Sequence, residues 1–506
     1  MLALQGGEDA KPANATDVLF IHPGSHRSLY QGLSDAFSAI EPPAFAGLFA
    51  NYLRLQGCSV GILDAAALNL EPDEAARQAL EDWNPTLIAL AVYGHQPSAS
   101  TQLMTAAGAI AAAIKALDPA RPVFMTGTHP AALPRRTLEE EAVDFVCDGE
   151  GPVTLFKTLA ALQAGGRDFA HIPSLWRRQE GHIVAPTTHE PLIQDLDRTL
   201  PSIAWDLLPM DRYRAHNWHC LDRLDQRAPY ASIHTSLGCP YRCSFCCINA
   251  PFHQPTYRMW SAASVLREID RLVNDHGVYN IKIIDEMFVL NRRHVLAICD
   301  GLIARGYPLN LWAYARVDTV KPAWLAQLKA AGFNWLCLGI ESASRHVRDG
   351  ADKHYHNHDI VSVVRQIQAA GIHVLGNYIF GLPDDDAESL QATLDLALEL
   401  NCEFANFYTA AAYPGSALYR QAVAQGLELP RRWHHFSQHS EEALPLPTAT
   451  LTPAEVLAFR DRAFTTYFTA PHYLTMVERT FGAAAVEHLC CMTAIPLRRK
   501  RLETLP

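Results

Sequence analysis

The first third of the chain alternates short apolar runs with longer amphipathic stretches. The predicted strands are 17–21, 59–64, 87–92, 123–126 and 144–147, and the predicted helices are near 45–55, 71–82, 101–117 and from 152 onward. Apolar strands separated by amphipathic helices are typical of parallel sheets that are covered on both faces. We therefore expect a doubly wound parallel sheet over residues 16–165, with ligand-binding loops at the carboxyl ends of its strands.

A second alternation begins near residue 229. Its predicted strands are 231–235, 280–284, 310–315, 335–340, 373–380 and 404–410, and its predicted helices are 262–275, 293–305, 322–331, 359–370 and 387–400. Six β/α units are too few for the closed barrel of eight units. The pattern predicts a partial (β/α)6 barrel over residues 229–425.

Three further segments lack this alternation. Residues 1–15 are polar and small and predict a flexible tail. Residues 166–228 are rich in proline but contain tryptophan and leucine side chains that would not stay in water, so they predict an ordered linker. Residues 426–506 predict a small helical region, which we expect to cap the open side of the barrel and to select the substrate.

The composition is that of an ordinary soluble globular protein, with 19% charged and 49% hydrophobic residues. A net charge of −11 would repel a phosphate backbone and argues against a nucleic-acid partner. The sequence predicts no membrane span, since no apolar run approaches ~20 residues, and the first residues do not resemble a signal peptide. We expect a cytoplasmic protein whose cysteines stay reduced.

Four of the twelve cysteines lie within nine residues, directly after the first predicted barrel strand. Reduced cysteines gathered in this way indicate a metal site, and barrel enzymes hold their chemistry in such loops. Cys239, Cys243 and Cys246 could bind a 4Fe-4S cluster, which would leave one iron open for a substrate or cofactor. Zinc is the alternative, but Cys247 adjoins Cys246 too closely to serve easily as a fourth ligand.

The spacing Cys239-x-x-x-Cys243-x-Phe245-Cys246 resembles the CxxxCxΦC signature of the radical S-adenosylmethionine family, in which Φ is aromatic. The resemblance implies that the three cysteines hold a 4Fe-4S cluster whose open iron binds S-adenosylmethionine. One electron would then cleave this cofactor to a 5′-deoxyadenosyl radical, which abstracts a substrate hydrogen. It also implies a small-molecule substrate and an electron donor such as flavodoxin or ferredoxin.

The same resemblance assigns S-adenosylmethionine binding to residues at the ends of the predicted barrel strands. Acidic side chains after the second strand would pair with the methionine ammonium, and Arg316 would suit the methionine carboxylate. The ribose would lie near the fourth strand and the adenine near a glycine motif at the fifth. The expected residues are Phe245, Asp285, Glu286, Arg316, Glu341, Ser342, Gly376 and Gly381.

A doubly wound domain ahead of such a barrel is similar to the cobalamin-binding class of this family, and the resemblance covers most of residues 16–425. It implies a flavodoxin-like sheet whose loops hold cobalamin, with glycines that let the backbone approach the macrocycle. The expected residues are His22, Pro23, Ser25, Tyr93, Gly94, Gly127, His129, Gly149, Glu150 and Gly151. The DxHxxG motif, whose histidine binds cobalt elsewhere, is absent. The alternative is a sheet that serves only as a scaffold.

The resemblance implies a cobalamin-dependent radical S-adenosylmethionine enzyme of the class B methyltransferase type. We expect it to methylate an unactivated carbon of a small molecule, such as a lipid or tetrapyrrole. One alternative keeps the cofactors but rearranges or cyclises the substrate without methyl transfer. A second alternative, from another functional class, is a cobalamin and iron–sulfur sensor of redox state or light.

Overall fold

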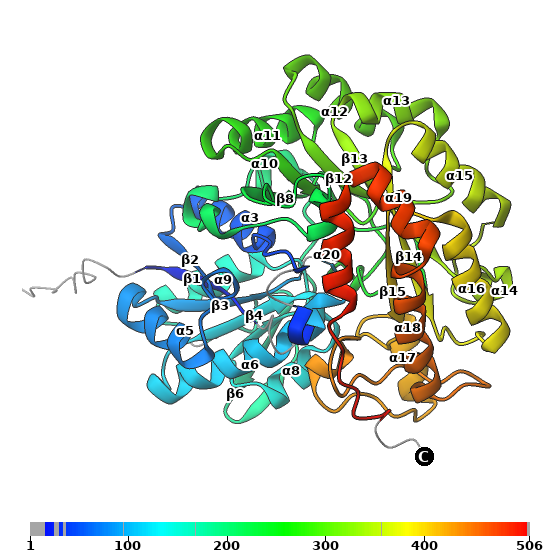
Figure 1. Ribbon diagram of the computed structural model, residues 1–506. Coiled ribbons are helices and arrows are strands. Elements are labelled where there is room, and N and C mark those ends of the chain that lie inside the picture. The colour runs from blue at the N-terminus through cyan, green and yellow to red at the C-terminus, as the bar shows by residue number, and fades with distance from the viewer. Residues whose placement is uncertain are drawn as a thin grey trace, which may run out of the picture.

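The computed structural model describes residues 16–24, 30–33, 37–94, 96–166, 168–355 and 357–502, so the predicted tail lies outside the described residues. Figure 1 shows two α/β units side by side, with the C-terminal helices against the second. Among the described residues, no helix is long and apolar enough to cross a membrane.

The first unit is a seven-stranded sheet in the order β2-β1-β3-β4-β5-β6-β7, of which the first five strands are parallel. The prediction of a doubly wound, flavodoxin-like sheet is confirmed, since its parallel strands have the order 2-1-3-4-5. These strands are β1 (Val18–His22), β2 (Val60–Asp64), β3 (Leu87–Val92), β4 (Val123–Gly127) and β5 (Phe145–Cys147). The helices are α3 (Ala44–Leu55), α4 (Ala65–Leu68), α5 (Pro72–Gln78), α6 (Ala99–Leu117), α7 (Thr128–Ala132), α8 (Pro134–Glu140) and α9 (Pro152–Gln163).

The sheet continues past the predicted boundary at residue 165, into the segment interpreted as linker. The strands β6 (Leu175–Gln179) and β7 (His182–Val184) add an antiparallel hairpin to the edge at β5. Glu180 and Gly181 make its turn with positive φ at both positions, the geometry of tight hairpins. These strands are short and half polar, so they carry no apolar run that would predict them.

The second unit is a six-stranded parallel sheet in the order β15-β14-β13-β12-β11-β8, which confirms the partial barrel. Its strands are β8 (Tyr230–Ile233), β11 (Asn280–Ile283), β12 (Asn310–Arg316), β13 (Phe333–Glu341), β14 (His373–Phe380) and β15 (Phe404–Thr409). Its helices are α11 (Ala262–His276), α12 (Arg292–Arg305), α13 (Pro322–Ala330), α14 (Arg345–Gly350), α15 (Asn357–Ala369) and α16 (Ala387–Leu400). The two outer strands of this sheet, β8 and β15, are not paired with each other within the described chain.

The C-terminal region covers the edge strand β15 with helices that also carry hydrogen-bond donors for it. Arg460 Nε donates to the carbonyl oxygen of Phe407, and the Tyr473 hydroxyl donates to that of Glu403. Covering an edge in this way blocks further strand pairing. The region contains α17 (Ala417–Ala424), the short 3-10 turn η7 (Trp433–Phe436), α18 (Pro453–Phe468), α19 (Pro471–Phe481) and α20 (Ala483–Thr493).

The segment between the two sheets is ordered and buries both of its tryptophans, Trp205 and Trp218. The carboxylate of Glu268 on α11 accepts hydrogen bonds from the Ile203 amide and from Trp205 Nε1, both at 2.9 Å. On the other side, Arg54 of α3 makes a bidentate pair with Asp206 at 2.8 Å. The segment therefore contacts both α/β units, and α10 (Leu196–Thr199) is its only α-helix among the described residues.

Candidate functional site

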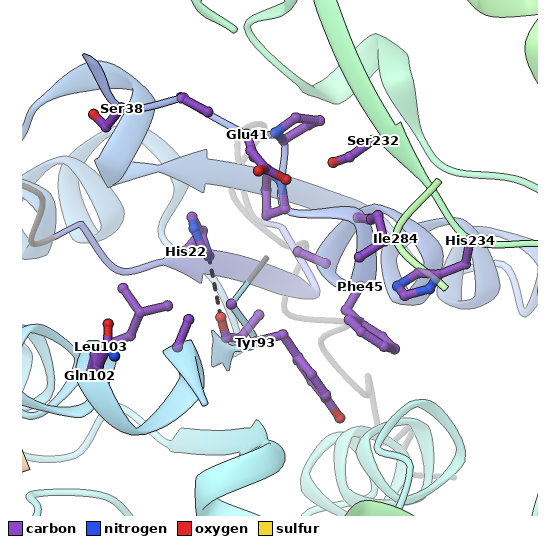
Figure 2. A pocket seen from close by; sticks show the side chains of 18 of the residues that line it. His22, Ser38, Glu41, Phe45, Tyr93, Gln102, Leu103, Ser232, His234 and Ile284 are labelled. Atoms are coloured by element: carbon purple, nitrogen blue, oxygen red, sulfur yellow. Dashed lines mark hydrogen bonds between the residues drawn. The ribbon is translucent and has the colours of Figure 1, made fainter. Parts of the chain in front are cut away.

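Two adjoining cavities lie where the carboxyl ends of both sheets face each other. The larger, of about 450 Å³, is lined by the cysteine loop, the ends of the barrel strands, the C-terminal region and residues 96–98 of the first unit. The smaller, of about 60 Å³, lies against the first sheet (Figure 2). The two share Tyr30, Ser38, Gln102, His216 and Ile284 in their walls.

The cysteine loop is held in place by backbone contacts. The strands β9 (Ser236–Leu237) and β10 (Arg258–Met259) pair and close its base. Gly238 has φ of +84°, and a Cβ there would lie 2.6 Å from the backbone of Thr256, so this turn requires glycine. Asn249 Nδ2 donates to the carbonyl oxygens of Cys239 and Tyr241, which fixes the loop beside the cavity.

All three predicted cluster cysteines line the larger cavity and carry free thiols. Burial raises the pKa of the Cys239 thiol to about 12 and that of Cys246 well above its usual range. A bound metal cluster would reverse this, because coordination deprotonates a thiol. Among the described residues, the groups whose ligand atoms all lie within 4.8 Å of one another do not include these cysteines.

Four of the predicted S-adenosylmethionine residues line the same cavity: Phe245, Glu286, Arg316 and Glu341. Burial raises the pKa of Glu286 to about 8, and a cationic ligand beside it would favour the carboxylate form. Arg316 pairs with Asp318 at 2.9 Å, and its Nη1 lies 3.7 Å from Cys243 Sγ. Carboxylate and guanidinium therefore flank the cysteines, as an amino acid ligand requires.

The other four predicted residues are not among those that line the cavity: Asp285, Ser342, Gly376 and Gly381. Asp285 is buried and accepts hydrogen bonds from the amide of Thr235 at 2.6 Å and from Ser236 Oγ at 2.7 Å. Ser342 lies 3.2 Å from Thr393 Oγ1. A Cβ at Gly376 would lie 2.8 Å from the Tyr378 hydroxyl, and one at Gly381 would lie 2.6 Å from Val456. These residues shape the strand ends behind the cavity wall.

The smaller cavity contains three of the predicted cobalamin residues, His22, Tyr93 and Gly94 (Figure 2). Phe45 stacks on Tyr93 with ring centroids 4.1 Å apart and lies 4.8 Å from His234. Both ring nitrogens of His234 are buried and have no hydrogen-bond partner among the described residues. The unpaired nitrogens of His234 call for a polar partner from a ligand. At about 60 Å³ this cavity could hold only a small part of a ligand as large as cobalamin.

The remaining predicted cobalamin residues do not line this cavity, and Ser25 lies outside the described residues. A Cβ at Gly127 would lie 2.1 Å from the Val92 carbonyl oxygen, so this glycine packs β4 against β3. His129 is buried and contacts Thr101 Oγ1 at 3.1 Å. Pro23, Gly149, Glu150 and Gly151 also lie outside its wall.

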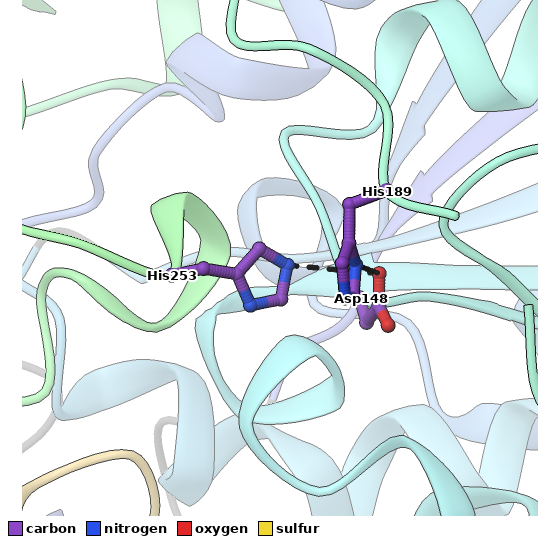
Figure 3. Close-up of side chains that lie close together, drawn as sticks. All are labelled: Asp148, His189 and His253. Carbon is purple, nitrogen blue, oxygen red and sulfur yellow. Dashed lines mark hydrogen bonds and ion pairs between the residues drawn. The ribbon is translucent and has the colours of Figure 1, made fainter. Parts of the chain in front are cut away.

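The loop after β5 instead contacts the barrel unit. Glu150 pairs with the buried Arg258 of β10 at 2.7 Å. Asp148 Oδ1 lies 3.3 Å from His189 Nδ1 and 3.7 Å from His253 Nε2, the latter from the segment after the cysteine loop (Figure 3). These contacts fix the first sheet against the cysteine loop and hold the two cavities together.

Residues 233–397 match the model of the radical SAM superfamily, and residues 36–157 match that of the B12 binding domain. An uncharacterized methyltransferase of Pyrococcus horikoshii is 29% identical over 78% of this chain and 82% of its own length. The chain therefore combines a B12 binding domain with a radical SAM domain, and over most of its length it is similar to a methyltransferase. Such an enzyme uses a 4Fe-4S cluster, S-adenosylmethionine and cobalamin. The cysteine loop lies in the first matched region and residues 96–98 lie in the second, whereas the C-terminal wall of the larger cavity lies beyond both.

The chain is also similar to a protein named as a cyclase and, in fold, to a methyltransferase of known structure. An anaerobic magnesium-protoporphyrin IX monomethyl ester cyclase of Cereibacter sphaeroides is 26% identical over 80% of this chain, which spans 63% of that protein. The methyltransferase TsrM of Kitasatospora setae, solved with tryptophan and a SAM analog, shares the fold with a TM-score of 0.66 at 18% identity, over 95% of this chain and 98% of that one.

The sequence did not predict one buried ion pair, which joins the two units. Lys282 is fully buried on β11, and its Nζ lies 3.2 Å from both oxygens of Glu41, beside His216. Lys282 lines the larger cavity and Glu41 the smaller, so this pair joins their walls. The signal was a lysine inside the apolar strand Asn280–Ile283, since a buried charge requires a partner.

Proposed function

We propose that this enzyme methylates a carbon atom of a small molecule bound in the larger cavity. The observation that carries the proposal is that the larger cavity is lined by both units. The cysteines of the barrel unit and residues 96–98 and 102 of the cobalamin-binding unit all contribute to its wall. A substrate in this cavity would face the site of radical formation and the site of methyl donation together.

The chain's own residues would bind and orient the groups. When bound, the cluster, S-adenosylmethionine and cobalamin supply the radical and the methyl group. Glu286 would accept the methionine ammonium, and Arg316 would bind the methionine carboxylate. The aromatic side chains of Trp218, Trp312 and Phe404 line the cavity and would exclude water from a reactive radical.

The radical step also requires one electron from outside the chain. We propose a small one-electron protein donor such as flavodoxin or ferredoxin. The support is chemical, because the cluster must be reduced before it can cleave the sulfonium cofactor. Replacing dithionite by reduced flavodoxin in the assay below tests this part.

Counting the products distinguishes methyl transfer from the alternatives. We would incubate the reconstituted holoenzyme with methyl-labelled S-adenosylmethionine, a reductant and a small-molecule cell extract as the source of the methyl acceptor, and quantify S-adenosylhomocysteine and 5′-deoxyadenosine. Methyl transfer predicts both products, and rearrangement or cyclisation predicts 5′-deoxyadenosine alone. A sensor would form neither. Cys243→Ala should abolish 5′-deoxyadenosine, whereas Cys490→Ala, an exposed thiol on α20, should not.

A further inference from the structure

A buried guanidinium on the C-terminal wall of the larger cavity has one free nitrogen. Arg460 of α18 is 4% exposed and lines the cavity. Its Nε donates to the Phe407 carbonyl oxygen at 2.8 Å, and its Nη1 donates to Asp461 Oδ1 at 3.0 Å. Its Nη2 has no hydrogen-bond partner within the described part of the chain. The two N–H donors of this nitrogen are therefore left for a ligand.

The local charge at this wall is not balanced by the protein. Arg499 is also 4% exposed and binds both oxygens of Asp461, at 2.8 and 2.9 Å. Two guanidinium groups thus share one carboxylate, which leaves a buried positive charge. Burying an unpaired charge is costly. His439 in the same wall adds no charge, because burial first and then the two arginines keep its pKa well below the usual range.

The charge of each lysine or other arginine that lines this cavity is balanced by a carboxylate that no second lysine or arginine shares. Lys353 pairs with Glu341, Arg316 pairs with Asp318, and Lys282 pairs with Glu41. Only Arg460 among the cationic residues of this wall pairs with a carboxylate, that of Asp461, which also pairs with a second arginine, Arg499. The excess positive charge in the cavity wall is therefore located at Arg460.

The neighbouring groups are suited to a ligand with an anionic end and an apolar body. Arg499 Nη1 donates to the Gln438 carbonyl oxygen at 2.6 Å, which places Gln438 beside this arginine pair. The side-chain Oε1 of Gln438 is buried without a hydrogen-bond partner among the described residues, and as an acceptor it calls for a donor elsewhere on the ligand rather than for its anionic end. Phe464, whose ring lies 5.2 Å from the Arg460 guanidinium, lines the same cavity with Met492.

We propose that Arg460 binds an anionic group of the substrate, a carboxylate or a phosphate monoester, whose remaining part is apolar. This rests on the proposed function, since it assigns the substrate to the larger cavity. The free guanidinium nitrogen can donate charge-assisted hydrogen bonds to the oxygens of either group. The methionine carboxylate of the cofactor is a separate anion, which we assign to Arg316 beside the cysteines.

Three naphthalene probes of matched shape test the proposal. Calorimetric titration of the holoenzyme with 2-naphthoate, 2-naphthyl phosphate and 2-naphthamide should show at least a tenfold preference for one of the anions over the amide. Arg460→Gln should abolish that preference. Arg462→Gln, which removes an exposed arginine from the same helix, should keep it. Which anion is preferred distinguishes a carboxylate from a phosphate substrate.

Several results would overturn the proposal. Equal affinity for the amide and the anions in the wild-type enzyme, or no binding of any probe, would do so without a variant, even if Arg460→Gln does not fold. Weaker binding of S-adenosylmethionine by Arg460→Gln, with the anion preference intact, would place Arg460 in the cofactor site. Assaying S-adenosylhomocysteine in the same preparations separates the anion site at Arg460 from the proposed methyl transfer. A preference for anions without formation of S-adenosylhomocysteine would refute methyl transfer and leave the anion site standing.

Discussion

Two neighbouring carboxylates at the end of β11 have different environments. Asp285 is fully buried and accepts hydrogen bonds from Thr235 and Ser236, which lead into the cysteine loop. Glu286 lines the larger cavity instead. Adjacent residues at a strand end point to opposite sides, so one serves the fold and the other can serve a ligand.

Replacing Glu286 by Gln should weaken S-adenosylmethionine binding about tenfold or more. The change keeps the shape of the side chain but removes the charge that would pair with the methionine ammonium, a contact worth about 1.5–3 kcal/mol. Equilibrium binding to the cluster-containing enzyme measures it. Asp285→Asn is the matched comparison: it should lower the melting temperature and the iron content. Unchanged cofactor affinity in Glu286→Gln would rule out the assigned contact.

At the residue scale, the sequence predicted which positions lie near the site but not which side chains face it. The cysteine spacing was the most informative local signal, because three thiols four and three residues apart can converge on one metal site. The Ser342 hydroxyl contacts Thr393 on α16, and the backbone at Gly381 packs against Val456 on α18. Both partners come from helices later in the chain. A local pattern carries no information about such partners.

At the element scale, Glu268 of α11 links the barrel to the segment before it, and this link should depend on pH. Burial raises the pKa of Glu268 to about 7, above its ordinary value of 4.5. Its contribution to stability is therefore complete below about pH 4.5 and is lost as pH rises through about 7, a difference of about 1–3 kcal/mol. Melting temperatures from pH 4 to 8 should fall less steeply in Glu268→Gln, whereas Glu388→Gln, exposed on α16, should follow the wild type.

The contact between β14 and α18 provides a second test at this scale. Gly381 has φ of +83°, and a Cβ there would lie 2.6 Å from Val456 Cγ1. Gly381→Ala should destabilise the protein by about 2–4 kcal/mol, from backbone strain and displacement of α18. Gly426→Ala has a similar φ of +67° but nothing within 4 Å, so it should cost only the backbone strain. Equal melting temperatures would contradict a packing role.

The regular elements were predictable because their periods are local properties of the chain. Residues 87–92, 373–380 and 387–400 have the predicted bounds. The hairpin β6–β7 was not predicted, since its polar edge strands are stabilised by pairing with β5 and not by their own pattern.

At the scale of the whole molecule, the two units should bind their cofactors separately. Anaerobic purification from cells supplied with cobalamin should give about one cobalamin and four irons per chain. Cys243→Ala should lose iron but retain cobalamin, because the smaller cavity lies against the first sheet. Cobalt and iron analysis measures both. Iron without cobalamin in the wild-type enzyme would make the first sheet a scaffold.

The sequence predicted both units but not how they face each other. The relative placement depends on side-chain pairs that join distant segments, such as Glu41 with Lys282 and Glu150 with Arg258. Taken singly, each of these charged residues gives no sign of its partner. Because the partners lie more than a hundred residues apart in the chain, no local sequence pattern predicts that they pair.

The turn η7 returns to the first unit after the barrel is complete. Trp433 and Phe436 pack into the apolar core of the first sheet, and His434 Nδ1 lies 3.1 Å from Thr105 Oγ1 on α6. The chain therefore makes a closed circuit, leaving the first unit through residues 185–229 and coming back through 433–436. If a protease cleaved the chain within residues 185–229, the packing of η7 against the first unit would still hold the two fragments together. Exchange of substrate or cofactor cannot proceed by swinging one unit about a single tether.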